Sequence, residues 1–159
     1  MPASSTAKSA SGSKVEALAQ RLTVGKPQAA LNGEIAACDC PEAARAGLYL
    51  LNGEVDAAHK IAQEITTPLG SHWHALVHRH EPDFPNSKYW LHRTGKSAIY
   101  PELAKAAQAA GQGDTVAPKG VWNADRFTDA YAAPNAPAWT RTLDELEMRL
   151  LLEHSLAQG

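Results

Sequence analysis

Residues 41–65, PEAARAGLYLLNGEVDAAHKIAQEI, contain two apolar segments separated by an Asn-Gly pair. Proline in the first turn and Asn-Gly at the end are typical of a helix, so residues 41–53 predict one helix. Residues 54–65 predict a second helix, because their apolar side chains recur at helical spacing. A turn this short brings the two helices side by side, and the stretch therefore predicts a helical hairpin.

A second hairpin follows. Residues 66–70, TTPLG, have the composition of a loop, and Ser71 is the expected N-cap of a helix that ends near Glu81, before a proline. Another helix is expected over residues 85–92. The helix–turn–helix pattern of the first hairpin repeats in the second after roughly 29 residues. This repeat resembles a tetratricopeptide-type layout.

The rest of the chain also follows helical patterns. A capping box at Ser13 starts the first helix and leaves residues 1–13 as a disordered tail. A similar box at Thr142 precedes the closing helix, LDELEMRLLLEHSLAQ. Because 159 residues suffice for one core, the predicted fold is all-α, with stacked antiparallel helical hairpins forming a single domain over residues 14–159.

The composition excludes several classes of partner. The net charge is −2, and basic residues are scattered among acidic ones, so we expect neither nucleic acid nor an anionic membrane as a partner. No stretch approaches the roughly 20 apolar residues of a membrane span. Residues 1–13 also lack the apolar centre of a signal peptide. We therefore expect a cytoplasmic protein that binds a small molecule, a peptide or another protein.

The two cysteines, Cys38 and Cys40, are separated by a single residue. This spacing is too tight for an ordinary disulfide framework, and no second pair is present to complete a zinc site. We expect reduced thiols of a cytosolic protein, with redox or metal use of the pair as the alternative.

Four of the seven histidines lie in residues 70–90, GSHWHALVHRHEPDFPNSKYW. Projected onto a helix at about 100° per residue, His80 falls on the apolar stripe that faces the core. His72 and Arg79 fall on the side that faces solvent. The histidines are therefore not expected to act together.

His74 and His78 form the sharpest candidate site. Their i, i+4 spacing puts both imidazoles on one face, about 6 Å apart along the axis, as in helix-borne zinc sites. A third ligand has to come from another helix, and His59 lies at the edge of the preceding apolar face. The predicted metal ligands are His59, His74 and His78, and the ion would be zinc, iron, manganese or nickel.

A polar network between helices around His59, His74, His78 and Glu81 is the interpretation that we favour over a bound metal, and unrelated surface histidines are the third. Histidines at the edge of a helical stripe often bond a neighbouring carboxylate, and Glu81 continues the same edge. The H-E-x-x-H motif of metalloproteases is absent, because residue 75 is alanine. For general acid–base chemistry, the catalytic candidates are His74, His78 and Glu81.

The surroundings of this cluster suggest a ligand. Arg79 and Arg93 would hold a small anion beside it, and Tyr89 and Trp90 would form the walls of the pocket. These four residues are the predicted ligand-binding residues. The rings expected to line a binding groove are those of Tyr49, Trp73, Tyr89 and Trp90.

Residues 73–90, WHALVHRHEPDFPNSKYW, resemble part of an uncharacterised family of small bacterial helical proteins. Residues 143–154, LDELEMRLLLEH, are similar to the C-terminal helix of that family. The resemblance covers approximately residues 45–155 and leaves the N-terminal tail outside. It implies membership of the family and carries no activity.

Two classes of function remain. The first is a ligand- or protein-binding module with a His/Glu polar cluster between its helices. The second is a metal-dependent or general acid–base enzyme of the hydrolase type that uses His59, His74, His78 and Glu81. We favour the first, because spacing alone assembles no complete catalytic set. The most informative observation is whether these four side chains converge around a cavity open to solvent.

Overall fold

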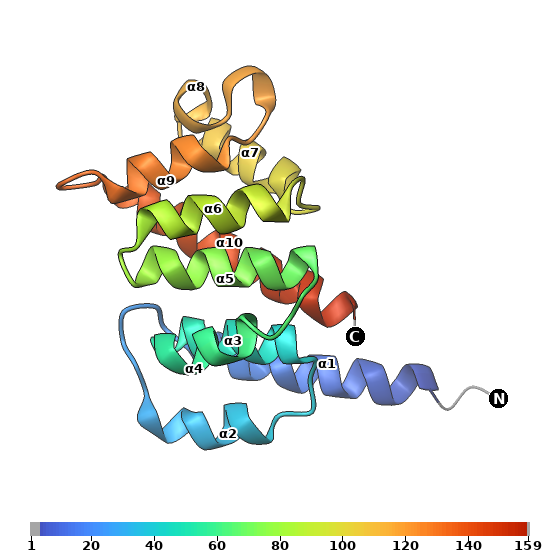
Figure 1. The fold of residues 1–159 in the computed structure, drawn as a ribbon. Coiled ribbons are helices and arrows are strands. Elements are labelled where there is room, and N and C mark those ends of the chain that lie inside the picture. The colour runs from blue at the N-terminus through green and yellow to red at the C-terminus, as the bar shows by residue number, and fades with distance from the viewer. Residues whose placement is uncertain (1–3, 159) are drawn as a thin grey trace.

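A computed structural model of the chain describes residues 4–158, and all its regular elements in this range are helices (Figure 1). The predicted all-α class is confirmed. No helix within the described range is both long and apolar enough to cross a bilayer. The helices are α1 Ser4–Gln20, η1 Ala29–Leu31, α2 Asn32–Ala37, α3 Glu42–Leu51, α4 Val55–Ala62, α5 Pro68–His80, α6 Phe84–Thr94, α7 Tyr100–Ala109, α8 Gly113–Val116, η2 Pro118–Gly120, α9 Ala124–Ala132 and α10 Ala138–Ala157.

Both predicted hairpins are present. The first consists of α3 and α4, and Gly53 turns the chain between them with a φ of 75°, a conformation that glycine adopts without strain. The second consists of α5 and α6, and the Asp83 side chain caps α6 by accepting a hydrogen bond from the Asn86 backbone at 3.4 Å. The hairpins contact each other through α4 and α5.

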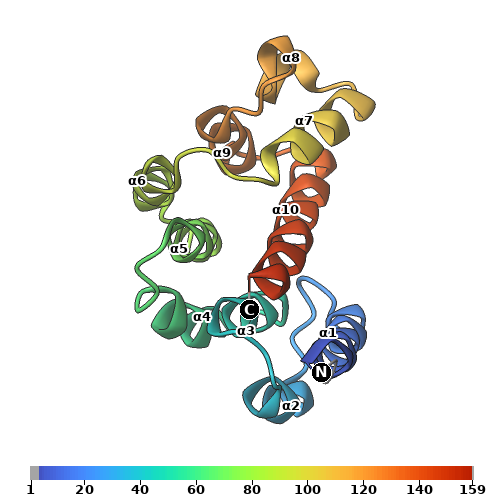
Figure 2. The ribbon, with the colours of Figure 1, turned by 90° about the vertical axis from the view of Figure 1, so that its right-hand side faces the viewer.

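The C-terminal helix joins the two ends of the fold. Figure 2 shows α4, α5, α6 and α9 as an arc, with α10 along its open side. Helix α10 contacts α3, α5, α7 and α9. Side chains from α5 and α10 therefore meet inside the arc, far from each other in sequence.

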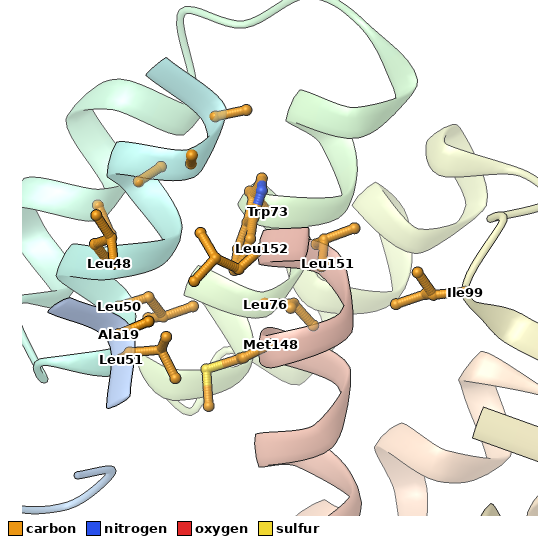
Figure 3. Close-up of a cluster of buried hydrophobic side chains, with 14 of the residues drawn as sticks. Ala19, Leu48, Leu50, Leu51, Trp73, Leu76, Ile99, Met148, Leu151 and Leu152 are labelled. Atoms are coloured by element: carbon orange, nitrogen blue, oxygen red, sulfur yellow. The ribbon is translucent and has the colours of Figure 1, made fainter. Parts of the chain in front are cut away.

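The apolar core lies where α3, α5 and α10 meet (Figure 3). Trp73 is fully buried there, and its Nε1 donates a hydrogen bond to Ser155 Oγ at 2.9 Å. Its ring lies against Gly47 of α3, where a Cβ atom would come within 2.6 Å of the ring. The expectation that Trp73 lines a binding groove is therefore wrong, because its ring fills the core.

Three helices begin earlier than the sequence predicts. Helix α5 includes Pro68, because the Thr67 hydroxyl accepts a hydrogen bond from the Gly70 backbone at 3.3 Å and caps it one turn before Ser71. Helix α10 begins at Ala138, and Thr142 lies inside it. Residues 4–13 belong to α1, whereas the sequence predicts a disordered tail over residues 1–13, of which residues 1–3 lie outside the described range.

Cys38 and Cys40 are joined by a disulfide, so the prediction of reduced thiols is wrong. Cys38 follows α2 with extended backbone, at φ −66° and ψ 139°. In extended backbone, side chains two residues apart point to the same side. The two Cα atoms lie 5.7 Å apart, within the range that a disulfide spans.

Candidate metal centre

Two neighbouring helices bring the predicted metal ligands together. His59 lies in the last turn of α4, and His74 and His78 lie one turn apart on α5. One ring nitrogen from each of the three histidines can be chosen so that all three nitrogens lie within 4.8 Å of one another. The predicted convergence of His59 with His74 and His78 is confirmed.

The distances approach those of a coordinated ion. His59 Nε2 and His74 Nε2 lie 3.0 Å apart. Two nitrogens bound to one tetrahedral zinc ion at 2.0–2.1 Å would lie about 3.3 Å apart. The separation of the His59 and His74 nitrogens is therefore close to that of two nitrogens that share one ion.

The Glu81 carboxylate contacts two of the three imidazole rings. Its Oε1 lies 2.6 Å from His59 Nδ1, and its Oε2 lies 3.0 Å from His78 Nδ1, although the latter contact is not aligned as a hydrogen bond. When Glu81 accepts the Nδ1–H of His59, the lone pair of that ring is on Nε2, which faces His74. A carboxylate behind a ligand histidine is the arrangement that orients imidazoles in metal sites.

His74 lies at the centre of the cluster. Its ring stacks on His78, with centroids 4.8 Å apart, and on Trp90, with centroids 4.1 Å apart. Burial, with additional repulsion from His78 and His59, lowers the pKa of His74 from 6.5 to about 4, against the opposing effect of Glu81. The ring is therefore neutral near pH 7, which is the form that binds metal.

The cluster is open to solvent on one side. The side chains of His59 and Glu81 keep 27% and 28% of their surface exposed. His74 and His78 are buried behind them. Three protein ligands are one fewer than in a closed structural zinc site, so an ion held here would take a further ligand from solvent.

The aromatic residues of α6 cover the cluster from the other side. Trp90 is half-buried against His74, and Tyr89 is exposed. The Arg93 guanidinium lies over both rings, 5.5 Å from the Trp90 centroid and 5.8 Å from the Tyr89 centroid. Trp90 therefore lies directly beside the cluster, and Tyr89 and Arg93 lie next to Trp90.

Arg79 does not belong to this site. It is buried and points to α10, where its guanidinium lies 2.9 Å from Asp144 Oδ1 and 3.2 Å from Glu147 Oε1. The expectation that Arg79 faces solvent beside the histidines is therefore wrong. The reason is that α3, α4, α6 and α10 all contact α5, so that residues 70–79 are buried on every side of the helix.

His72 and His80 extend this second, buried group. His80 Nε2 lies 2.8 Å from Asp144 Oδ2, as expected for a histidine at a helix interface. His72 is also buried, contrary to the prediction, with Nε2 3.8 Å from Glu147 Oε2. Within the described part of the chain, neither ring nitrogen of His72 has a hydrogen-bond partner.

The buried carboxylates are the residues that sequence reasoning missed. Burial alone would raise the pKa of Asp144, but the hydrogen bond from His80 and the charge of Arg79 hold it below its usual value. Burial opposes ionisation of Glu147 in the same way, and the nearby Arg79 and His72 hold its pKa below its usual value. Two carboxylates around one guanidinium form a structural ion cluster that joins α5 to α10.

No protein-family model, curated protein or solved structure matches the chain. Membership of the uncharacterised bacterial family and the tetratricopeptide-type layout therefore stay predictions. A function for the chain has to be argued from the geometry of its own residues.

Proposed function

We propose that the chain is a binding module whose ligand is one divalent transition metal ion, held by His59, His74 and His78. The observation that carries the proposal is the convergence of three ring nitrogens from α4 and α5. The proposal adds a metal ligand to the predicted His/Glu cluster between helices. Three imidazoles with a carboxylate behind them are the ligand set and the supporting group that metal sites use.

The nature of the ligands limits the choice of ion. Neutral imidazoles suit zinc, iron, nickel and copper better than calcium or magnesium, which prefer oxygen. The low pKa of His74, about 4, keeps that ligand free of protons at neutral pH. We therefore expect zinc or a neighbouring divalent transition ion, with water at the position left open toward solvent.

Metal analysis of protein prepared without an affinity tag tests the proposal. We expect about one equivalent of zinc after equilibration with the ion and a higher thermal midpoint with metal than with chelator. His74→Ala and His78→Ala should each lose both effects. His92→Ala is the matched control, because His92 is an exposed histidine paired with Asp125 at 2.7 Å, away from the cluster.

Two results would overturn the proposal. One is metal content well below one equivalent in the untagged protein after equilibration. The other is equal metal content in the His74→Ala and His92→Ala variants, which would place the ion elsewhere.

Metal-assisted hydrolysis is the second candidate function. The open side at His59 and Glu81 favours it, because an ion with a bound water there can supply a nucleophile near neutral pH. Glu81 is a positioning residue in this scheme, since both its oxygens face histidine nitrogens. Hydrolysis of activated phosphate and carboxylate esters by the zinc-loaded chain, absent in His74→Ala, tests this second candidate. The sequence-based expectation of a cytoplasmic location stays a proposal.

A further inference from the structure

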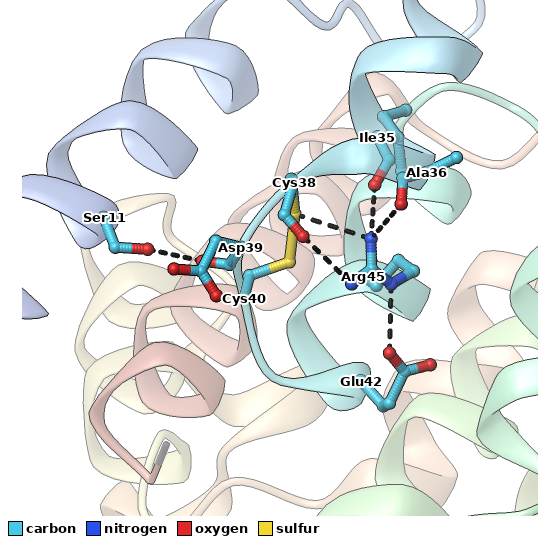
Figure 4. Close-up of a disulfide and its surroundings, with 8 residues drawn as sticks. All are labelled: Ser11, Ile35, Ala36, Cys38, Asp39, Cys40, Glu42 and Arg45. Atoms are coloured by element: carbon cyan, nitrogen blue, oxygen red, sulfur yellow. Dashed lines mark hydrogen bonds and ion pairs between the residues drawn. A yellow bond between two sulfur atoms is a disulfide. The ribbon is translucent and has the colours of Figure 1, made fainter.

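The disulfide between Cys38 and Cys40 lies in the short connection between α2 and α3 (Figure 4). It encloses a single residue, Asp39. The stabilisation that a disulfide gives to a fold decreases as the enclosed loop becomes shorter. This disulfide ties together one turn of chain instead of two distant elements, so structural stabilisation does not account for it.

The Arg45 guanidinium, whose Nε also pairs with Glu42 Oε1 at 3.1 Å, lies beside one of the two sulfurs. Arg45 Nη1 lies 3.9 Å from Cys38 Sγ, and Arg45 Nη2 donates to the Cys38 carbonyl oxygen at 3.0 Å. The same guanidinium donates to the carbonyl oxygens of Ile35 and Ala36 at 2.6 and 2.8 Å. Figure 4 shows these bonds converging on Arg45 from the end of α2. A guanidinium held in this way stabilises a thiolate at Cys38 when the disulfide opens.

The disulfide lies at the edge of a cavity, and both cysteines keep part of their surface exposed. Cys38 and Cys40 are half-buried. A cavity of about 450 Å³ between α1 and α2 is lined by Cys38 and by the apolar Val15 and Leu18. Its charged lining residues are the cationic Lys14 and Arg21 and the acidic Glu34 and Asp39. A space of this size accepts a small molecule and is too small for a folded protein.

We propose that Cys38 and Cys40 form a thiol–disulfide exchange site for low-molecular-weight thiols. The thiolate of one substrate molecule attacks Cys40 Sγ. The Cys38–Cys40 bond breaks, and its electron pair remains on Cys38 Sγ as a thiolate beside Arg45. Cys38 is the leaving sulfur because the thiolate that is better stabilised leaves faster.

A second substrate thiolate completes the exchange. It attacks the substrate sulfur of the mixed disulfide, forms the substrate disulfide and releases Cys40 as a thiolate. Two substrate thiolates are thus oxidised to one disulfide while the Cys38–Cys40 disulfide is reduced by two electrons. Solvent protonates the released thiolates to the extent that the pH dictates. A substrate disulfide drives the same steps in reverse.

Equilibration of the full chain in mixtures of reduced and oxidised glutathione tests the proposal. The thiols are trapped with a maleimide and counted by intact mass, and the fold is followed by circular dichroism. We expect both cysteines to become reduced together while the helical signal is unchanged. A disulfide that opens only after urea unfolds the chain, or a pair that stays reduced in oxidised glutathione, overturns the proposal.

Arg45 variants test the role of the charge. Arg45→Gln should lower the thiolate absorbance of the reduced chain at pH 7 and slow exchange about tenfold, whereas Arg45→Lys keeps the charge and should retain most of the rate. Arg149→Gln is the matched control, because Arg149 also donates to backbone carbonyls, those of Ala19 and Leu22, but none of its bonds involves a cysteine. Equal rates in Arg45→Gln and Arg149→Gln contradict the proposed role.

Cys38→Ala keeps the proposal testable if Arg45→Gln fails to fold. In this variant oxidised glutathione can form the mixed disulfide at Cys40, and no Cys38 thiolate is present to release it intramolecularly. We expect one glutathione adduct per chain by mass. The absence of an adduct in folded Cys38→Ala would show that the site does not accept the thiol.

Discussion

His59 Nε2 and His74 Nε2 lie 3.0 Å apart, although the two residues are 15 positions apart in sequence and belong to different helices. Two protonated imidazoles at this distance would repel each other strongly. At least one ring is therefore neutral, and its lone pair or N–H faces the other ring. A cation at this position replaces the contact between the rings with two nitrogen–metal bonds.

The first prediction concerns Glu81. Glu81→Gln replaces one acceptor oxygen with an NH₂ donor, so the side chain can no longer face the Nδ1 atoms of both His59 and His78 as an acceptor. We expect zinc affinity to fall by about 10–100-fold, the effect of removing a carboxylate behind a ligand histidine. Competition with a chromophoric chelator measures this change.

Glu64→Gln is the control for Glu81→Gln. Glu64 is exposed just beyond the end of α4, close in sequence to His59, and the substitution makes the same change in charge. We expect its zinc affinity to stay within about twofold of the unmodified chain. Similar losses in both variants would mean that Glu81 acts only through its long-range charge.

The second prediction concerns the effect of pH on the metal-free chain. The pKa of His74 is about 4 in the folded state and 6.5 ordinarily, so between these values the unfolded state binds a proton that the folded state does not. The free energy of unfolding should therefore fall as the pH is lowered from 6.5 to 4. Allowing for partial solvation of the site, we expect a loss of about 1–2 kcal/mol.

Urea unfolding at several pH values measures this loss. In His74→Gln the proton-binding group is absent, and the decrease between pH 6.5 and 4 should be smaller by the same amount. His92→Gln, at an exposed histidine, should keep the full decrease. If the two variants respond identically to pH, the decrease arises from other groups.

The third prediction concerns the buried ion cluster between α5 and α10. Asp144→Asn leaves the buried Arg79 with one carboxylate fewer. Removing one partner from a buried pair costs about 3–5 kcal/mol, and we expect a loss of unfolding free energy in this range. Asp129→Asn breaks the surface pair with Lys88 and should cost less than about 1 kcal/mol.

The same cluster predicts the behaviour in acid. The pKa values of Asp144 and Glu147 are lower in the folded state than their usual values. At any pH above those usual values, the two ionised carboxylates therefore contribute their full stabilisation to the folded state. It is lost as the pH falls below about 4 toward the folded values. The acid-unfolding midpoint should consequently rise in Asp144→Asn relative to Asp129→Asn. A midpoint shared by both variants contradicts this assignment.

The convergence of the three histidines could be predicted because its determinants are local. The i, i+4 spacing of His74 and His78 fixes their shared face, and the short hairpin connection places His59 on the neighbouring helix. Glu81 follows one turn later on the same edge. Each of these relationships depends on a separation of a few residues or one turn between helices, which sequence patterns describe well.

The buried ion cluster could not be predicted in the same way. Helical spacing predicts a single buried face for α5. The helix lies at the centre of the fold, however, so Arg79 and His72 on its other faces are buried as well. Asp144 and Glu147, three residues apart within the apolar stripe of α10, are the signal that was present in the sequence. Their partner lies more than sixty residues away, and only the packing of α10 across the arc brings it there.

The last prediction tests the packing of α3 on α5. Gly47→Ala would place a Cβ atom 2.6 Å from the Trp73 ring, which the hydrogen bond to Ser155 and full burial hold in place. We expect a loss of about 1–3 kcal/mol of unfolding free energy, the usual cost of overpacking a core. Gly33→Ala, in the exposed part of α2, meets no described atom within 4 Å and should be stabilising by about 0.5–1 kcal/mol.

Urea unfolding of both variants measures the difference in stability. Trp73→Phe in the Gly47→Ala background should recover part of the loss, because the smaller ring leaves room for the added methyl group. Equal stability of the two alanine variants would show that α3 moves away from α5 without cost.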